Sequence, residues 1–289
     1  MAVGNHVENP FEFVLEKFGW AISGIGRGRD EAQRAAARVE PHVRRLEAAD
    51  LKDALRKGLS DFAAARDDVV FIAIIYPLAG LGLAALAMRM DLLPMVFPLV
   101  SGFALIGPLA AVGLYEISRR REAGETVNWM DAAGVLRSPA LGSILQMGLV
   151  LIGLFALWLG AAYAISQLAF AGAPPATVAG FLHTVFATGG GWAMIVIGVA
   201  VGFAFAVVAL ALSVVSFPLL LDRHVDLDVA IRTSFKVVAE NPRIMALWGL
   251  IVAGSLALGA IPALMGLIVV VPVLGHATWR LYRKAVGPD

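Results

Sequence analysis

A run of 84 residues, Ser138 to Leu221, contains no Asp, Glu, Lys or Arg and constrains this chain more than any other feature. A membrane-spanning helix needs about 20 mostly apolar residues, so the run is long enough for two spans and an uncharged connection, residues 171–191. Composition agrees, because 59% of the 289 residues are hydrophobic, only 16% are charged, and the mean hydropathy is +0.80. We therefore expect an integral membrane protein.

The chain contains no cysteine, which excludes disulfides, thiolate metal ligands and thiol nucleophiles. Its net charge of +1 gives no indication of nucleic-acid binding, and we expect none. Acidic and basic residues interrupt residues 11–22, so no cleavable signal peptide is expected. We expect three parts: a cytosolic N-terminal segment (1–49), partly helical or loose; a six-helix membrane domain (50–284); and a short cytosolic tail (285–289).

Six apolar blocks are separated by polar residues or prolines, and each is expected to form a membrane span. Their approximate bounds are 69–88, 92–117, 144–170, 192–221, 245–261 and 263–281. The predicted fold class is all-α: a polytopic membrane protein with six transmembrane helices arranged as three hairpins. Of the 23 Lys and Arg residues, only Arg89 falls in an expected outer turn, so the positive-inside rule predicts that both termini are cytoplasmic.

An internal repeat precedes two of the hairpins, since residues 50–62 match residues 226–238 at a constant offset. The apolar positions recur at steps of four and three, which predicts one face of an amphipathic helix, with Lys52, Asp53, Lys57 and Asp61 on the remaining surface of the first copy. Asp50 and Asp226 occupy expected N-cap positions. A weaker copy, residues 128–139, precedes the third span. Each hairpin is therefore expected to follow a cytoplasmic amphipathic helix, which either binds the membrane surface or a partner, or simply packs under the bundle.

The uncharged outer connection contains a helix candidate of its own, residues 177–187, between Pro174-Pro175 and Gly189. Two placements are open: an interfacial helix that covers the outer ends of the spans, or a re-entrant element whose backbone is shielded by protein or water. The absence of charge fits an ion filter poorly and favours the cover helix.

Prolines lie inside the expected spans at Pro77, Pro98, Pro108, Pro218 and Pro272, and each is expected to kink its helix. Transporters use such breaks at binding sites, but they surround them with charged or polar groups. Polar residues are sparse in these spans, so helix packing is the simpler explanation.

The candidate functional positions are the few polar residues in or next to the spans: Tyr76, Tyr115, Glu116, Asp222, Arg223 and His276. Glu116 lies near Arg119 and Arg120, which favours an ion pair at the membrane interface over a catalytic carboxylate. A lone His276 in the last span either titrates in a functional role or hydrogen-bonds a neighbouring helix.

Acidic residues alternate through the segment that holds Asp222, His224, Asp226 and Asp228. Two-residue spacing does not bring ligands to one centre without a tight loop, so no metal site is expected. The sequence has no phosphate-binding loop, nucleophile elbow or metalloprotease motif, and we expect no catalytic residue and no cofactor.

Several strings in the chain resemble one family. They are Tyr76-Pro77 and residues 97–108, 113–121, 136–140, 216–222, 241–248 and 272–279. Over about residues 39–284 the chain resembles the bacterial integral membrane proteins grouped as domain of unknown function 2189. The resemblance implies a multi-pass protein of the bacterial inner (cytoplasmic) membrane, and it implies no established activity, substrate or cofactor.

Members of that family are sometimes labelled cytochrome c oxidase subunit I, and the histidines test this label. A haem-copper subunit needs about six intramembrane histidines for two haem irons and a copper ion. This chain has five histidines in total, and only His276 falls in an expected span. The sequence excludes a catalytic oxidase, although an accessory role in a respiratory complex stays open.

The leading functional hypothesis is a non-enzymatic scaffold or accessory protein that organises partners or lipids at the cytoplasmic face. Its expected partners are the lipid bilayer and, as a second class, other membrane proteins. The alternative is a small-molecule or lipid transporter, and an intramembrane enzyme is less favoured because buried polar residues are few.

Overall fold

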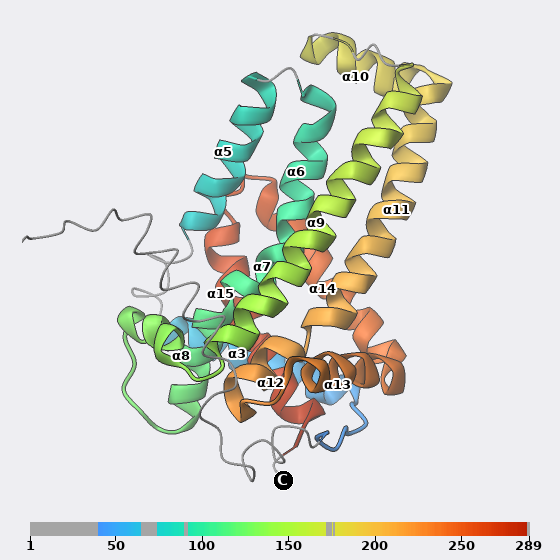
Figure 1. The fold of residues 1–289 in the computed structure, drawn as a ribbon. Coiled ribbons are helices and arrows are strands. Elements are labelled where there is room, and N and C mark those ends of the chain that lie inside the picture. Colours follow the sequence, from blue (N-terminus) through green and yellow to red (C-terminus); the bar gives the residue numbers. More distant parts are fainter. Residues whose placement is uncertain (1–39, 65–73, 90–91, 172–174, 176, 288–289) are drawn as a thin grey trace, which may run out of the picture.

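The computed structural model describes residues 40–64, 74–89, 92–171, 175 and 177–287. Long helices stand side by side above a layer of shorter helices (Figure 1). Within the described ranges, extended backbone pairs only in one antiparallel bridge, between Val43 and Val286. The protein is therefore all-helical, as the sequence predicts.

The helices follow the apolar blocks of the sequence. The long ones are α5 (Ile75–Arg89), α9 (Leu141–Ala169), α11 (Gly189–Ser213), α14 (Pro242–Ala260) and α15 (Leu267–Ala285). A further rod is built from the successive segments η1 (Leu93–Met95), α6 (Val96–Phe103), η2 (Ala104–Ile106), α7 (Gly107–Ala110) and α8 (Val112–Glu122). The short helices are α3 (Ala48–Ala64), η3 (Trp129–Arg137), α10 (Val178–Ala187), α12 (Ser216–Arg223) and α13 (Leu227–Glu240).

Four helical stretches in the described residues are long and apolar enough to cross a membrane: Leu93–Glu122, Leu141–Ala169, Gly189–Arg223 and Pro242–Ala260. The apolar part of α5, Pro77–Met88, is shorter. Helix α15 carries Arg280, Arg283 and Lys284 in its last turns. The structure thus shows a helical membrane protein with four candidate spans.

Most of the span prolines begin a new helical segment rather than kink a continuous helix. Pro98 lies in the first turn of α6, Pro108 in the first turn of α7, and Pro218 in the first turn of α12. A proline in the first turn removes a backbone donor that has no partner within the helix. Among the span prolines in the described part of the chain, only Pro272 lies beyond the first turn of its helix, α15. The kinks expected from Pro98, Pro108 and Pro218 are therefore breaks between segments.

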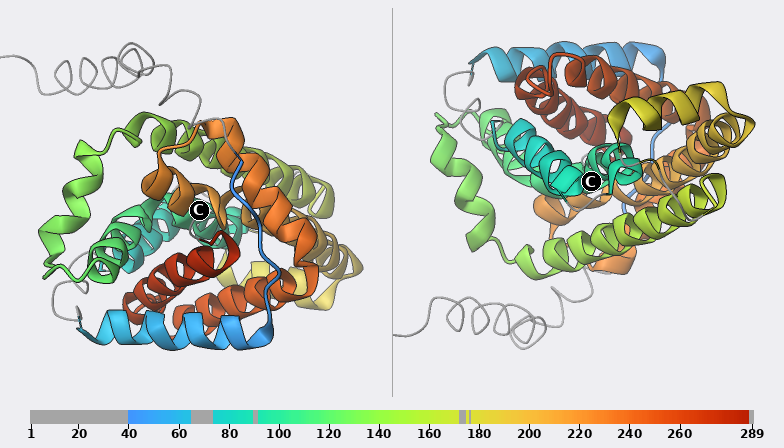
Figure 2. Two further views of the ribbon diagram at one scale, coloured as in Figure 1. Left: turned by 90° about the horizontal axis from the view of Figure 1, so that it is seen from below. Right: turned by 90° about the horizontal axis from the view of Figure 1, so that it is seen from above.

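Each short helix that precedes a helical pair packs against the end of a different pair. Helix α3 lies along α15, η3 lies along α8, and α13 lies against α12 and α11. Figure 2 (left) shows α3, η3 and α13 around the outside of this end of the molecule. Helix η3 contacts α8 and helix α13 contacts α11, in each case a member of the pair that precedes it in the sequence, whereas α3 contacts α15, in the last pair. The contacts therefore form a closed ring.

The internal repeat appears as α3 and α13, but its buried face is shifted from the expected one. The small residues Ala54 and Gly58 are buried in α3, and their equivalents Ala230 and Ser234 are buried in α13. Small side chains let two helices approach closely, and this close packing decides which face is buried. Some of the large apolar residues expected to be buried are therefore displaced to the flank of each helix.

The helix caps correct one expectation and support another. Asp50 lies inside the first turn of α3, where its carboxylate accepts a hydrogen bond from the backbone N–H of Glu47 at 3.0 Å, so it is not the N-cap. Asp226 directly precedes α13, as expected. At η3, Asn128 and Asp131 form a reciprocal capping box, with bonds of 2.9 and 2.8 Å. All three short helices thus begin at a polar residue near the expected position.

Helix α10 lies across those ends of the long helices that are remote from the layer of short helices (Figure 1). The hydroxyl of its N-cap, Thr177, accepts a hydrogen bond from the backbone N–H of Gly180 at 3.1 Å. The helix packs against α11 and η1. This position corresponds to the cover helix of the two placements that the sequence left open.

Replacing Gly58 by alanine is expected to destabilise the protein by about 1–3 kcal/mol, the usual cost of overpacking. A Cβ at Gly58 would lie 2.6 Å from the backbone nitrogen of Ala277 and 2.7 Å from its Cβ, so α3 would have to move away from α15. The melting temperature of the detergent-purified protein measures the effect.

Gly153→Ala in α9 is the matched control, because a Cβ there would meet no atom within 4 Å. It should leave the melting temperature unchanged or raise it slightly, since alanine favours helix over glycine. Equal shifts for the two variants would contradict the close contact between α3 and α15.

Candidate functional site

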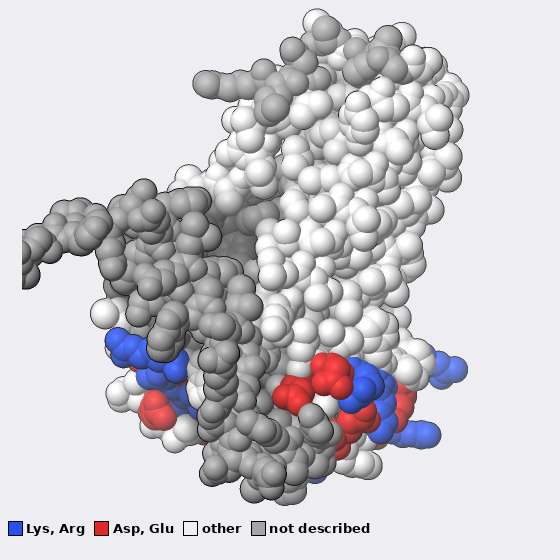
Figure 3. All heavy atoms as spheres, in the orientation of Figure 1, with Lys and Arg blue, Asp and Glu red and all other residues white. Residues whose placement is uncertain are grey.

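Charged side chains gather at one end of the molecule. Figure 3 shows Lys, Arg, Asp and Glu on that end, and the other described residues in view are uncharged. This end is built from α3, η3, α8, α12, α13 and the last turns of α15, and we call it the charged base. Most of the candidate positions from the sequence lie in this base.

The charged base is organised around the last turns of α15. Arg280 forms a bidentate ion pair with Asp61 of α3, at 2.8 and 3.1 Å. Arg121 of α8 contacts the same carboxylate at 3.3 Å. Because Asp61 is only 4% exposed, these contacts join three helices through one buried carboxylate.

Two further carboxylates hold the same part of α15. Glu122 accepts hydrogen bonds from the indole N–H of Trp279 at 2.8 Å and from Arg283 at 3.3 Å. Asp222 accepts a hydrogen bond from the Tyr282 hydroxyl at 2.6 Å and one from Arg283 at 3.0 Å. Burial, and then the charge of Asp222, raise the pKa of Tyr282 well above its usual range, so the phenol stays protonated and remains a donor.

Lys284 joins the end of α15 to the start of α3. Its ammonium lies 3.0 Å from Asp53 and 3.2 Å from Asp50. The hydrogen bond that Lys284 donates to Asp53, followed by the one that it donates to Asp50, raises the pKa of Lys284 against the effect of desolvation. The backbone N–H of Glu47 lowers the pKa of Asp50. Both ends of the described chain are therefore held together by charge at this base.

Asn241 ties the segment before α3 to the end of α13. Its buried side chain accepts a hydrogen bond from the backbone N–H of Leu46 at 2.6 Å and donates one to the carbonyl of Arg44 at 3.1 Å. Arg44 also donates its backbone N–H to the carbonyl of Ala285 at 2.9 Å. The chain before α3 thus runs across the base and is held there by these hydrogen bonds.

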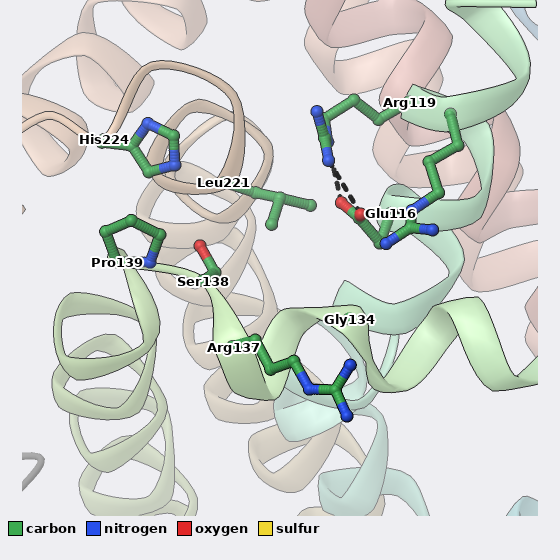
Figure 4. Close-up of a pocket in the computed structure, with 9 residues that line it drawn as sticks. Glu116, Arg119, Gly134, Arg137, Ser138, Pro139, Leu221 and His224 are labelled. Atoms are coloured by element: carbon green, nitrogen blue, oxygen red, sulfur yellow. Dashed lines mark hydrogen bonds and ion pairs between the residues drawn. The ribbon is translucent and has the colours of Figure 1, made fainter. Parts of the chain in front are cut away.

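Glu116 lies in a pocket of about 210 Å³ between α8, η3 and the α12–α13 connection (Figure 4). Its carboxylate accepts two hydrogen bonds from Arg119, at 2.7 and 2.8 Å, and one from Arg120 at 2.7 Å. Arg120 also contacts Asp131 at 2.7 Å. We call this the arginine pocket; it is lined by Glu116, Arg119, Arg120, Gly134, Arg137, Ser138, Pro139, Leu221 and His224.

His276 lies in α15 and is fully buried. Its Nδ1 is hydrogen-bonded to the hydroxyl of Ser118 in α8 at 2.7 Å, and its Nε2 has no hydrogen-bond partner in the described residues. The contact between helices corresponds to the second of the two readings that the sequence left open, a hydrogen bond to a neighbouring helix.

The remaining candidate positions are divided between the base and the long helices. Tyr115 is buried in α8, and Arg223 of α12 donates a hydrogen bond to the carbonyl of Gly287. Tyr76 lies in the first turn of α5, and its side chain is outside the described residues. The structure therefore brings Glu116, Asp222, Arg223, His276 and Tyr115 to one end of the molecule.

Asp222 belongs to the network around α15. Over the described ranges, no group of three or more His, Asp or Glu residues lies together in a way that could hold a metal ion. The alternating acidic segment is divided between the end of α12 and the start of α13.

Asp61 is the main residue that the sequence pattern assigned to the wrong environment. The amphipathic pattern placed it on the polar surface of its helix, but the structure buries it. Asp61 lies three residues after Gly58 and seven after Ala54, on the face of small residues that packs against α15. This spacing was the signal in the sequence from which the burial of Asp61 could have been predicted.

Residues 96–222 match the family model described as "Predicted integral membrane protein (DUF2189)". This match confirms the resemblance to that family over the segment from α6 to the end of α12. All lining residues of the arginine pocket except His224 lie within the matched segment. No curated protein and no solved structure matches the chain.

Proposed function

We propose that this protein crosses the bacterial inner membrane six times, with both termini in the cytoplasm, and that it organises lipids or partner proteins at the cytoplasmic face without catalysis. Helices α5 and α15 complete the six spans beside the four candidate spans. Their packing supports this: α5 lies against α6, and α15 lies against α14, as in the pair formed by α9 and α11. The charged base is then the cytoplasmic end.

One observation carries the proposal: the two copies of the repeat expose a large apolar side chain at the same position. Leu59 of α3 is 55% exposed, and the equivalent Phe235 of α13 is 45% exposed. Basic residues neighbour both positions, Arg56 beside Leu59 and Lys236 beside Phe235. Exposed apolar residues flanked by basic ones are typical of helices that lie in the membrane interface.

The packing of α3 leaves room for such a contact. Its buried face, centred on Ala54 and Gly58, lies against α15, while Asp53 pairs with Lys284 on one flank. At 100° per residue, Leu55 and Leu59 fall on the opposite flank. A helix in this arrangement can pack on the bundle, hold its charged flank in water and insert its apolar flank among lipids.

The chemistry of the base favours positioning over catalysis. Asp61, Glu116, Glu122 and Asp222 each contact at least one arginine. A general base must lie within hydrogen-bond reach of the proton that it takes from a substrate, whereas these carboxylates are engaged by arginines. Asp61, Glu122 and Asp222 also join α15 to other helices, which suits a rigid platform.

Cysteines introduced one at a time test the interfacial placement, because the chain has none of its own. Leu59→Cys and Phe235→Cys, each labelled with a polarity-sensitive fluorophore and reconstituted in vesicles, should show blue-shifted emission that nitroxide-bearing lipids quench. Lys57→Cys is the matched control, because Lys57 lies on the Asp53 flank of the same helix and is exposed; it should show emission like that in water.

The same variants report sidedness. A membrane-impermeant maleimide should label Lys57→Cys in inverted membranes and Ala179→Cys, in α10, only on the opposite side. Weak, equal quenching at positions 59, 235 and 57 would reject the interfacial platform, and labelling of positions 57 and 179 from one side would reject the topology.

A further inference from the structure

We propose that the arginine pocket binds the phosphate group of an anionic phospholipid of the cytoplasmic leaflet. The inference rests on the proposed function, because it identifies the lipid group that the charged base would hold. It is carried by the charge of the pocket, by donors left free around Glu116, and by the position of the pocket relative to the uncharged part of the chain.

The lining of the pocket is cationic. Arg119, Arg120 and Arg137 line it together with a single carboxylate, that of Glu116. Arg137 is exposed, and within the described residues its side chain makes no ion pair and no hydrogen bond. An arginine presents a planar set of donors that matches the oxygens of a phosphate, so an unpaired Arg137 in the lining of a cationic pocket is suited to an anion.

Glu116 orients two arginines without using all their donors. It engages Nε and Nη2 of Arg119 and Nε of Arg120, and Asp131 engages Nη1 of Arg120. In the described structure, Nη1 of Arg119 and Nη2 of Arg120 keep their hydrogens for another acceptor. Because the carboxylate already holds both guanidinium groups, little side-chain entropy is lost when an anion binds.

The position of the pocket relative to the uncharged run favours a lipid as the source of the phosphate. Arg137 and Ser138 mark the start of the uncharged run, and Leu221 is its last residue; all three line the pocket. The two ends of the uncharged run therefore meet there, at the border between the charged and the uncharged segments of the chain. Lipid phosphates lie at this border, just outside the hydrocarbon core.

The pocket also has the size and the mixed lining that a lipid phosphate requires. Its volume of about 210 Å³ is large compared with the roughly 10–15 Å³ that holds one water molecule. Pro139 and Leu221 form an apolar part of the wall beside the arginines (Figure 4). A phosphate that continues into a glycerol and acyl chains would contact both parts.

Native mass spectrometry of the detergent-purified full chain, titrated with phosphatidylglycerol, tests the inference. We expect the wild type to retain the lipid and Arg137→Gln to bind it about tenfold more weakly, the loss that corresponds to one charged hydrogen bond. Arg137→Lys keeps the charge and should retain most of the affinity. Since Arg137 is exposed, none of these changes should alter the melting temperature.

Arg243→Gln is the matched control, because Arg243 is an exposed arginine at the start of α14 that does not line the pocket. Phosphatidylglycerol affinity should be unchanged in this variant. An equal loss in the Arg137 and Arg243 variants would overturn the site, since it would indicate attraction by surface charge alone.

Inorganic phosphate is titrated in a parallel arm. If it bound in an Arg137-dependent way while phosphatidylglycerol did not, the lipid assignment would be overturned in favour of a free anion. The fluorescence of labels at positions 59 and 235 is independent of this arm, so failure of the lipid site and failure of the interfacial platform can be told apart.

Discussion

Replacing Asp61 by alanine is expected to lower the free energy of unfolding by about 3 kcal/mol, the lower end of the range for breaking a buried ion pair. The carboxylate is 4% exposed and is shared by Arg280 and Arg121. Its removal leaves two arginines partly buried without their counter-ion. The lower end applies because the side chains of these arginines are 16% and 25% exposed and can gain some water.

The melting temperature and the rate of thermal inactivation in detergent measure this effect, because membrane proteins often unfold irreversibly. Asp53→Ala is the matched control on the same helix. Asp53 pairs with Lys57 and Lys284 at the surface, where exposed pairs contribute about 0–1 kcal/mol. If the two alanine variants lost stability equally, Asp61 would not be the link between α3, α8 and α15.

Trp279→Ala is expected to cost about 3–5 kcal/mol, the usual range for removing a large buried aromatic side chain. Trp279 is 1% exposed, its ring lies 5.4 Å from that of Tyr282, and its indole N–H donates to Glu122. The substitution therefore creates a cavity and also leaves Glu122 with fewer donors. The loss should appear as a large fall in melting temperature.

Trp192→Ala provides the comparison, because Trp192 also donates its indole N–H, to the carbonyl of Phe186 at 3.0 Å, but is 54% exposed. Its replacement should cost less than about 1 kcal/mol. Trp279→Phe should fall between the two, since it keeps most of the volume and loses one hydrogen bond, typically about 1–3 kcal/mol to a charged group. A similar small loss in both alanine variants would show that the base is not packed around α15.

Hydropathy predicted the helices well because each apolar block is long and bounded by polar residues or prolines. The block around residues 144–170 became α9, and the block around 192–221 became α11 and α12. Prolines marked real boundaries, but their effect depended on context: Pro218 begins a segment, whereas Pro272 lies within α15. The position of a proline in a sequence does not show whether the residues before it continue the helix.

The candidate site was only partly predictable. Charge next to a span identified Glu116 and its arginines, because Arg119 and Arg120 lie three and four residues away on one helical face. His276 and Ser118 are 158 residues apart, and no local pattern relates them. The same holds for Asp61 and Arg280, which meet only because α3 packs along α15.

The amino-acid sequence by itself determined that the protein lies in a membrane, that it is helical, and that its charged segments are separated from its uncharged ones. These properties follow from local hydropathy and from the cost of placing charge in lipid. The tertiary structure decided which faces of α3 and α13 are buried, which carboxylate lies at the centre of the base, and where the two ends of the uncharged run meet. Those outcomes depend on close contact between helices that are distant in the chain. The missing Cβ at Gly58 lets α3 approach α15, and the carboxylate of Asp61 pairs with Arg280 of α15.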